Sequence, residues 1–86
     1  MAKAATAKQR ARWERLRELG CSVCKAFMPE IHHAKTGMGG RKNHDLVFAL
    51  CHFHHRGVKG IHTIGRKVWQ EIYGTEDEHL AKVAHI

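Results

Sequence analysis

Two pairs of cysteine and histidine side chains have the spacing of a structural zinc site. Cys21 and Cys24 form a C-x2-C pair, and Cys51 and His54 form a C-x2-H pair after residues 25–50. Two residues between ligands allow a tight turn to direct both side chains at one ion, and two such pairs complete a tetrahedral site. We therefore expect one structural zinc. Such an ion can supply on the order of 10 kcal/mol of apparent binding free energy to a small domain.

Two alternatives to this zinc site depend on the same part of the chain. His52 or His55 could replace His54 as the fourth ligand, although the spacing favours His54. The cysteines could instead be buried free thiols, or Cys21 and Cys24 could form a thiol redox pair. The second ligand pair and the absence of a βαβ pattern argue against a redox protein.

Histidine is concentrated in the middle of the chain. There are nine histidines against eight acidic residues, and seven of the nine lie within residues 32–62. Clustered histidines are typical of metal ligands and catalytic bases. Neighbouring side chains of a strand point to opposite faces, so one residue of the His32-His33 pair could bind an ion while the other holds a water molecule. Exposed surface positions are expected for His44, His52, His79 and His85.

A helix is the first element predicted to position these side chains. Residues 2–19 are rich in Ala, Lys, Gln, Arg, Glu and Leu and contain no Pro or Gly, which predicts a helix that Gly20 ends. We divide the chain into a basic helical arm, residues 1–20, and the domain that carries the Cys and His residues, residues 21–86. The arm could lie along phosphates, or it could be a solvated helix anchored by Trp13.

The middle of the chain predicts two antiparallel strands. Residues 27–35 and 44–50 are candidate strands, and the second contains a short apolar run that suits a buried strand. The glycine-containing segment 36–43 predicts the loop that joins them.

Two helices are predicted after the strands. Apolar residues should share one face of the first helix, which Gly74 ends: Val68, Trp69, Ile72 and Tyr73. The segment Thr75–Glu78 matches a capping box, which predicts a second helix with Leu80 and Val83 directed inward.

Composition limits the class of protein. The 86 residues make one domain with a thin core, and the formal net charge of +7 favours a polyanionic partner. No apolar run has the roughly 20 residues that a membrane span requires, and the N-terminus has no apolar signal segment. We expect an intracellular protein without a membrane segment.

The Cys and His framework resembles that of the HNH, or ββα-metal, endonucleases. The resemblance covers Cys21 to Gly74 and includes both ligand pairs, the His32-His33 pair and Asp45-Leu46. Residues 39–46 and 62–74 are similar to small phage nucleases, among them the recombination-enhancement nucleases. The resemblance implies a small α+β zinc-bound domain with a ββα-metal motif between N- and C-terminal helices. It also implies the cytoplasm of a bacterial host if the gene belongs to a phage or prophage.

The resemblance also implies roles for individual residues. His33 matches the general base of the family, and His32, His55 and His62 match the ligands of a catalytic divalent ion. Asp45 lies where the family usually has an asparagine that orients the base, and an aspartate there could instead be a ligand. Two or three imidazole ligands suit Zn, Ni or Mn better than Mg. Two glycines between His55 and His62 leave the position of His62 open.

DNA is the expected substrate, and a recombinase–DNA filament is a possible partner, because some relatives depend on one. Basic residues of the arm, the loop and a later helix are candidate phosphate contacts: Arg10, Arg12, Arg41, Lys42, Arg66 and Lys67. The alternative function is a non-catalytic zinc-stapled module that binds nucleic acid.

Overall fold

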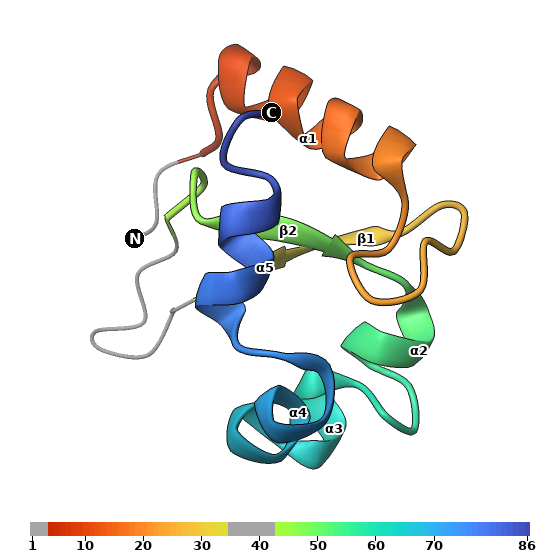
Figure 1. The fold of residues 1–86 in the computed structure, drawn as a ribbon. Helices are drawn as coiled ribbons and strands as arrows, with labels where there is room; N and C mark the ends of the chain where they lie inside the picture. The colour runs from red at the N-terminus through yellow and green to blue at the C-terminus, as the bar shows by residue number, and fades with distance from the viewer. Residues whose placement is uncertain (1–3, 35–42) are drawn as a thin grey trace.

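The computed structural model of the chain describes residues 4–34 and 43–86 (Figure 1). Within these ranges the sheet consists of two antiparallel strands, β1 (Glu30–His33) and β2 (Val47–Leu50). Helix α1 (Ala7–Leu19) precedes the sheet. The helices that follow it are α2 (His52–His55), α3 (Ile61–Ile64), α4 (Arg66–Tyr73) and α5 (Glu76–Lys82). The predicted small α+β domain is confirmed, whereas most of the predicted loop, including Arg41 and Lys42, lies outside the described residues.

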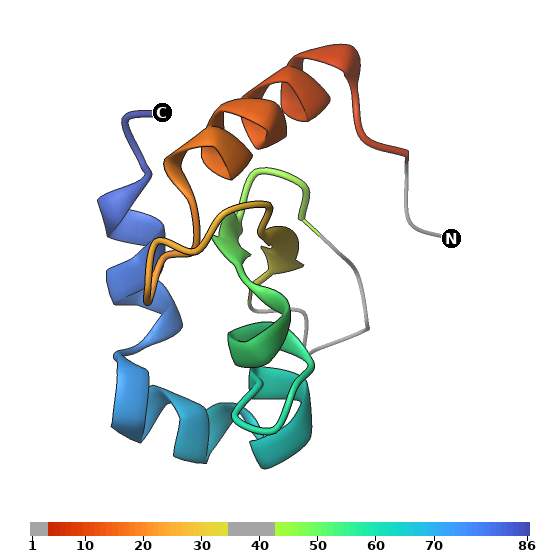
Figure 2. The same cartoon turned by 90° about the vertical axis from the view of Figure 1, so that its right-hand side faces the viewer.

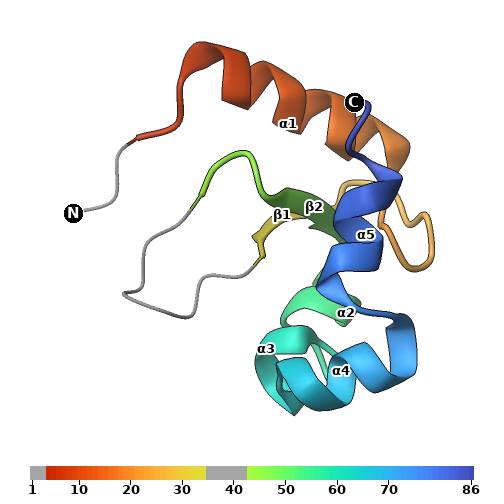
Figure 3. The ribbon, with the colours of Figure 1, turned by 60° about the vertical axis from the view of Figure 1, so that its left-hand side comes forward.

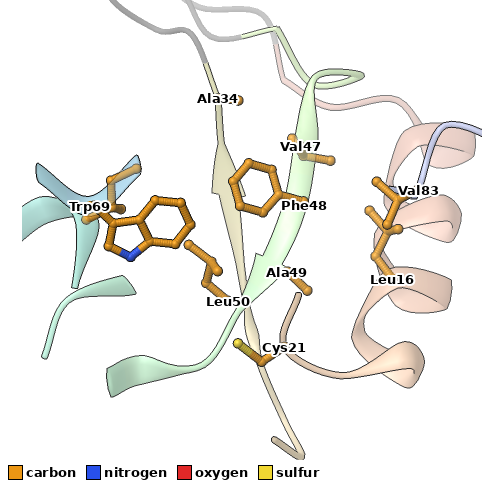
Figure 4. Packing of buried hydrophobic residues seen from close by; sticks show 10 residues of the cluster. Leu16, Cys21, Ala34, Val47, Phe48, Ala49, Leu50, Trp69 and Val83 are labelled. Carbon is orange, nitrogen blue, oxygen red and sulfur yellow. The ribbon is translucent and has the colours of Figure 1, made fainter. Parts of the chain in front are cut away.

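Strand β2 is buried on both faces, as its apolar sequence predicts. Phe48 and Leu50 point toward Trp69 of α4 (Figure 4). Successive side chains of a strand alternate between faces, so the other β2 residues face α1 and the C-terminal end of the chain. The apolar residues gathered on that side are Val47, Ala49, Leu16 and Val83 (Figure 4). The sheet thus lies in the middle of the core, with α1 on one side and α3 and α4 on the other (Figure 3).

Helix α1 begins at an N-terminal capping box. The hydroxyl of Thr6 accepts a hydrogen bond from the backbone N–H of Gln9, whose side chain accepts one from the backbone N–H of Thr6. The helix ends before Gly20, as predicted. Because Leu16 is buried in the core, the basic helix packs on the sheet.

Both strands are shorter than the sequence predicted. Met28 has a φ of 57° and Phe27 is 89% exposed, so the extended backbone of β1 starts only at Glu30. On the other side, the backbone N–H of Leu46 donates to the carbonyl of Asn43. This turn delays the start of β2 to Val47.

The four apolar residues predicted to share one face of α4 are buried to different degrees. Trp69 is fully buried and Tyr73, one turn later, packs on the core, but Val68 and Ile72 are 46% and 55% exposed. Helix α4 has only eight residues and packs on the core through Trp69 and Tyr73, so apolar side chains beside this contact remain exposed. The predicted end at Gly74 is confirmed.

Helix α5 begins at the predicted capping box between Thr75 and Glu78. It leads from the α4 end of the molecule back toward α1 (Figure 2). There the guanidinium of Arg12 donates to the backbone carbonyl of Val83 at 3.0 Å. None of the helices in the described part of the chain has the length and apolar character of a membrane span.

The expectation that His79 is a surface residue is wrong. Its side chain is 1% exposed and stacks on Phe48, with ring centroids 5.0 Å apart. The Nε2 atom lies 2.9 Å from the carbonyl oxygen of Tyr73, and Nδ1 lies 2.5 Å from the hydroxyl of Ser22. These two polar contacts allow an imidazole to be buried between α5 and the segment that holds Cys21.

Candidate metal centres

The side chains of both cysteine-containing pairs converge. Ligand atoms of Cys21, Cys24, Cys51 and His54 all lie within 4.8 Å of one another. The Sγ atoms of Cys24 and Cys51 are 3.8 Å apart, and His54 Nδ1 lies 3.8 Å from Cys21 Sγ and 3.2 Å from Cys51 Sγ. Tetrahedral zinc with ordinary bond lengths places its ligand atoms about 3.6–3.8 Å apart. The Cys3His cluster could therefore hold a structural zinc, and it contains His54 rather than His52 or His55.

A tight turn after α1 brings the first cysteine pair together. Gly20 has a φ of 89°, and a Cβ added there would lie 2.6 Å from the carbonyl oxygen of Lys25, so the close approach requires glycine. The turn closes through a hydrogen bond from the N–H of Lys25 to the carbonyl of Cys21. The N–H of Val23 donates to the sulfur of Cys21 at 3.4 Å. Backbone donors of this kind reduce the charge on a thiolate that binds an ion.

The cysteine thiols have opposing pKa shifts. Burial raises the pKa of Cys21, but hydrogen bonds from the backbone around Cys51, Cys24 and Val23 outweigh it, so this pKa is lowered overall. The pKa of Cys51 is raised, first by burial and further by the charge of Cys21. Neighbouring thiolates repel each other until a cation joins them, and a bound zinc would deprotonate all three thiols.

A second cluster contains histidines alone. Ligand atoms of His32, His55 and His62 lie within 4.8 Å of one another, and the Nε2 atoms of His55 and His62 are 3.0 Å apart. His32 comes from β1, His55 from α2 and His62 from α3. The predicted ligand trio is thus brought together in space.

The glycines between His55 and His62 make this convergence possible. Helix α2 ends at His55 and α3 starts at Ile61, so the chain turns back between them. A Cβ added to Gly60 would lie 2.5 Å from the backbone carbon of His55, a distance that no side chain tolerates. Glycine at this position lets α3 pack closely enough for His62 to meet His55.

The carboxylates of two glutamates contact the buried imidazoles of His32 and His55. His32 Nε2 lies 2.7 Å from a carboxylate oxygen of Glu76, which is 2% exposed, and Arg66 pairs with the other oxygen at 3.0 Å. His55 Nδ1 lies 2.6 Å from a carboxylate oxygen of Glu30. Carboxylates that accept from the outer nitrogen of an imidazole are typical partners of metal-binding histidines, because they fix the tautomer and the ring orientation.

One ring nitrogen of His32 remains without a partner among the described residues. Its Nδ1 is buried and makes no hydrogen bond within residues 4–34 and 43–86. Burial lowers the pKa of His55, and burial together with the nearby histidines lowers that of His62. A divalent cation binds imidazole in its neutral form. A buried ring nitrogen that has no partner among the described residues can therefore serve as a ligand.

His33 lies on the opposite face of β1, toward α1. Its Nε2 is 2.9 Å from Nδ1 of His44, and the two ring centroids are 5.1 Å apart. The indole of Trp13 meets the ring of His33 edge-on at 5.4 Å. The structure therefore separates His33 from the three-histidine cluster by the width of the strand.

A family model described as recombination enhancement, RecA-dependent nuclease matches residues 5–86. The chain belongs to this family. Comparison with curated proteins and with solved structures gave no match. The recombination-enhancement resemblance noted in the sequence is thereby confirmed. The match extends beyond Cys21–Gly74 and includes α1 and α5, the helix that provides Glu76.

Asp45 faces α1. A carboxylate oxygen of Asp45 accepts from the side chain of Gln9 at 3.3 Å, and its backbone carbonyl accepts from Arg12 at 3.3 Å. Its backbone N–H is held by the side chain of Asn43. The metal clusters of the described residues do not include Asp45, and its role as orienting residue or ligand stays a prediction.

The predicted phosphate contacts of the nuclease differ in their surroundings. Arg10 and Lys67 are exposed. Arg12 is half-buried and bonded to backbone carbonyls, and Arg66 pairs with Glu76. Arg10 also donates to the backbone carbonyl of Ala5 at 2.5 Å. Of these four residues, the exposed Lys67 is therefore better placed to meet a phosphate.

Sequence reasoning missed three residues next to the predicted ones: Glu30, Glu76 and His44. The two glutamates contact histidines that lie 25 and 44 positions away in the chain. No spacing within a short segment of the sequence therefore predicts these contacts. His44 was expected to be exposed but is half-buried beside His33. Its position directly before Asp45, in the segment of the family resemblance, was the available signal.

Proposed function

We propose that this member of the family is a metal-dependent DNA endonuclease of the HNH type that hydrolyses phosphodiester bonds. The observation that carries the proposal is the buried Nδ1 of His32, which lies beside His55 and His62 and has no hydrogen-bond partner within residues 4–34 and 43–86. A buried nitrogen without a partner costs about 1–3 kcal/mol unless an ion occupies the site. The succession β1, β2, α2 around this cluster supports the ββα-metal interpretation.

The three histidines would hold the ion. His32 would contribute Nδ1, because Glu76 occupies its Nε2, and His55 would contribute Nε2, because Glu30 occupies its Nδ1. Imidazole ligands favour Zn, Ni or Mn over Mg. When bound, a divalent ion stabilises the negative charge that develops on the leaving 3′ oxygen.

His33 would be the general base. It follows His32 directly in β1, and because the two side chains lie on opposite faces of the strand, a phosphate would have to sit at the strand edge to reach both. The neutral imidazole would take a proton from water, the hydroxide would attack phosphorus, and the bond from phosphorus to the 3′ oxygen would break as that oxygen takes a proton from solvent. The products are a 5′-phosphate and a 3′-hydroxyl. An imidazole pKa of about 6.5 suits this transfer at physiological pH.

We further propose that a RecA–DNA filament presents the substrate. The description of the family supports this dependence. The net charge of +7 favours DNA as the direct ligand, and filament formation would then decide which DNA strand is accessible to β1.

Cleavage by a His33→Ala variant tests the proposal. Zinc-loaded protein is incubated with circular single-stranded and supercoiled DNA, with and without a RecA filament, in Mn or Mg. The parent should cleave, and His33→Ala should lose about 10²–10⁴-fold in rate while it keeps its fold, its zinc and its DNA affinity. His85→Ala, at an exposed histidine near the C-terminus, is the matched control.

Equal rates for His33→Ala and the parent, with contaminating nuclease excluded, would refute the general-base role. Absence of metal-dependent cleavage by the parent under all these conditions would favour the alternative, a zinc-stapled module that binds nucleic acid.

A further inference from the structure

Two apolar side chains project from the loop between α1 and β1. Phe27 and Met28 are 89% and 77% exposed, the highest exposed fractions among the large apolar side chains of residues 4–34 and 43–86. The loop that carries them extends beyond the sheet (Figure 1). Single exposed apolar residues are ordinary on a protein surface, whereas adjacent ones that border a groove are candidates for contact with another molecule.

The backbone on either side holds this loop in a fixed conformation. Met28 has a φ of 57° and Lys25 a φ of 65°, values that residues other than glycine rarely adopt. Ala26 packs against the core, its carbonyl accepts from the N–H of Cys21 at 3.1 Å, and Pro29 is buried. Backbone strain of this kind persists where the surrounding structure enforces it, and it is common at binding sites. A loop held in this way loses little conformational entropy when a partner binds.

A groove of about 350 Å³ lies between this loop and α1. Both acidic residues of α1 line it, and because they are four positions apart they share one face of the helix. Arg17 also lines the groove and pairs with Glu14. Two carboxylates against one guanidinium leave the groove with an excess of one negative charge, on a chain whose net charge is +7. The full lining is Glu14, Arg17, Glu18, Phe27, Met28 and Pro29.

The charge of the groove decides which class of molecule fits it. The exposed carboxylates of Glu14 and Glu18 repel the phosphates of DNA. A second copy of the chain would bring two acidic grooves together, and like charges across an interface oppose binding. A protein surface that offers an apolar side chain to the groove and a Lys or Arg to its rim is complementary in both respects. Aromatic residues, Met and Arg are the residues enriched at such interfaces.

We propose that Phe27 and Met28, with the groove beside them, form the surface that binds a RecA protomer of the RecA–DNA filament. The inference rests on the proposed function, in which the filament presents the DNA, and the family is described as RecA-dependent. A filament offers DNA phosphates and recombinase protomers side by side. Basic side chains of the chain meet the phosphates, and this acidic, apolar surface meets the recombinase.

Filament binding by a double variant tests the proposal. Phe27→Ser/Met28→Asn removes both apolar side chains, and asparagine tolerates the left-handed backbone at position 28. Because both side chains are exposed, the variant should keep its fold, its zinc and its affinity for naked DNA. We expect about tenfold weaker co-sedimentation with RecA filaments on single-stranded DNA. Val58→Ser, at a residue that is 73% exposed elsewhere in the chain, is the matched control.

A charge reversal separates protein from DNA as the occupant of the groove. Glu18→Lys should weaken filament binding about threefold, because the rim loses its attraction for a basic partner. If the groove met phosphates, the same substitution would strengthen binding to naked DNA and to the filament alike. That result would overturn the proposal.

The outcomes separate this inference from the proposed function, because filament binding is measured without cleavage. Equal filament binding by the double variant and the parent, or a parent that does not bind the filament, would overturn the inference. An equal loss of affinity for naked DNA would also overturn it, since Phe27 would then stack on bases, as would a parent dimer that the double variant does not form. A parent that binds the filament through this loop but does not cleave DNA would refute the proposed hydrolysis and support this surface.

Discussion

At the scale of the residue, His32 is held by two interactions of different origin. Its place next to His33 is local, and the sequence predicted it as a ligand for that reason. Its hydrogen bond to Glu76 depends on how α5 folds back over the sheet, which no spacing within the sequence encodes. The residues that converge in the two clusters could therefore be predicted, whereas the carboxylates that contact them could not.

Glu76→Gln should weaken the ion at the histidine cluster. The amide can accept a hydrogen bond from His32, but it removes the negative charge that raises the basicity of the imidazole, and partners of this kind are worth about 10–100-fold in metal affinity. Titration of Mn or Zn into zinc-loaded protein measures the change. Glu71→Gln, at an exposed position of α4, should bind the ion like the parent, and equal affinities in all three proteins would contradict the supporting role of Glu76.

His79 should make the fold sensitive to acid. Burial lowers its pKa in the folded protein, whereas in the unfolded chain it is about 6.5. The unfolded state therefore binds more protons below that pH, so this contribution to stability is complete above about pH 6.5 and decreases as the pH falls toward the folded pKa. Urea unfolding of zinc-loaded protein between pH 7.5 and 5.5 measures the decrease.

The variant His79→Gln isolates this contribution. It should be less stable than the parent at neutral pH by about 1–3 kcal/mol, because it disturbs the buried hydrogen bonds, yet lose less stability on acidification. Parallel pH profiles for the two proteins would show that His79 does not titrate differently in the folded and unfolded states. Zinc retention is measured at each pH.

At the scale of the element, three helix ends were predicted more accurately than the strand ends, whereas the start of α1, expected at residue 2, lies at Ala7. Gly20, Gly74 and the capping box at Thr75 are local signals that act within one turn. The ends of the strands depend on the turn at Asn43 and on the positive φ of Met28, neither of which follows from a hydrophobic pattern. The exposed Val68 and Ile72 show the same limit, since the apolar pattern does not say how much of a helix meets the core.

Gly60→Ala should displace α3 and disrupt the histidine cluster. The added methyl group would collide with the backbone of His55, which cannot move without α2. We expect a loss of about 1–3 kcal/mol in the free energy of unfolding, typical of overpacking, and at least tenfold weaker ion binding at the cluster. Zinc at the Cys3His site should be retained. Lys59→Ala, at the exposed neighbouring position, is the control, and unchanged ion affinity in Gly60→Ala would show that α3 does not need this close approach.

At the scale of the whole molecule, few apolar side chains hold the elements together. The fully buried large apolar side chains include Trp69, Phe48, Leu16 and Leu50. Domains of this size often need a metal or a disulfide to fold, and the Cys3His cluster joins the end of α1 to the start of α2. The sequence predicted this candidate zinc site because its cysteine and histidine residues come in two closely spaced pairs.

Removal of zinc should unfold the protein. Cys51→Ser should leave the purified chain largely unfolded by circular dichroism, and a strong chelator should do the same to the parent, because the binding free energy of the ion is folding free energy. Metal analysis of the parent should give about one tightly bound zinc per chain. A folded, reduced parent without zinc would contradict a structural role for the site.

The two candidate metal centres share one peptide bond, because His54 belongs to the Cys3His cluster and His55 to the histidine cluster. A zinc ion that fixes His54 would also fix the backbone from which His55 projects, so an ion that binds the histidine cluster would meet a smaller loss of conformational entropy in ordering His55. The two sites are then linked thermodynamically. Linkage is reciprocal: by whatever factor zinc raises the affinity of the histidine cluster, an ion at that cluster raises the affinity for zinc.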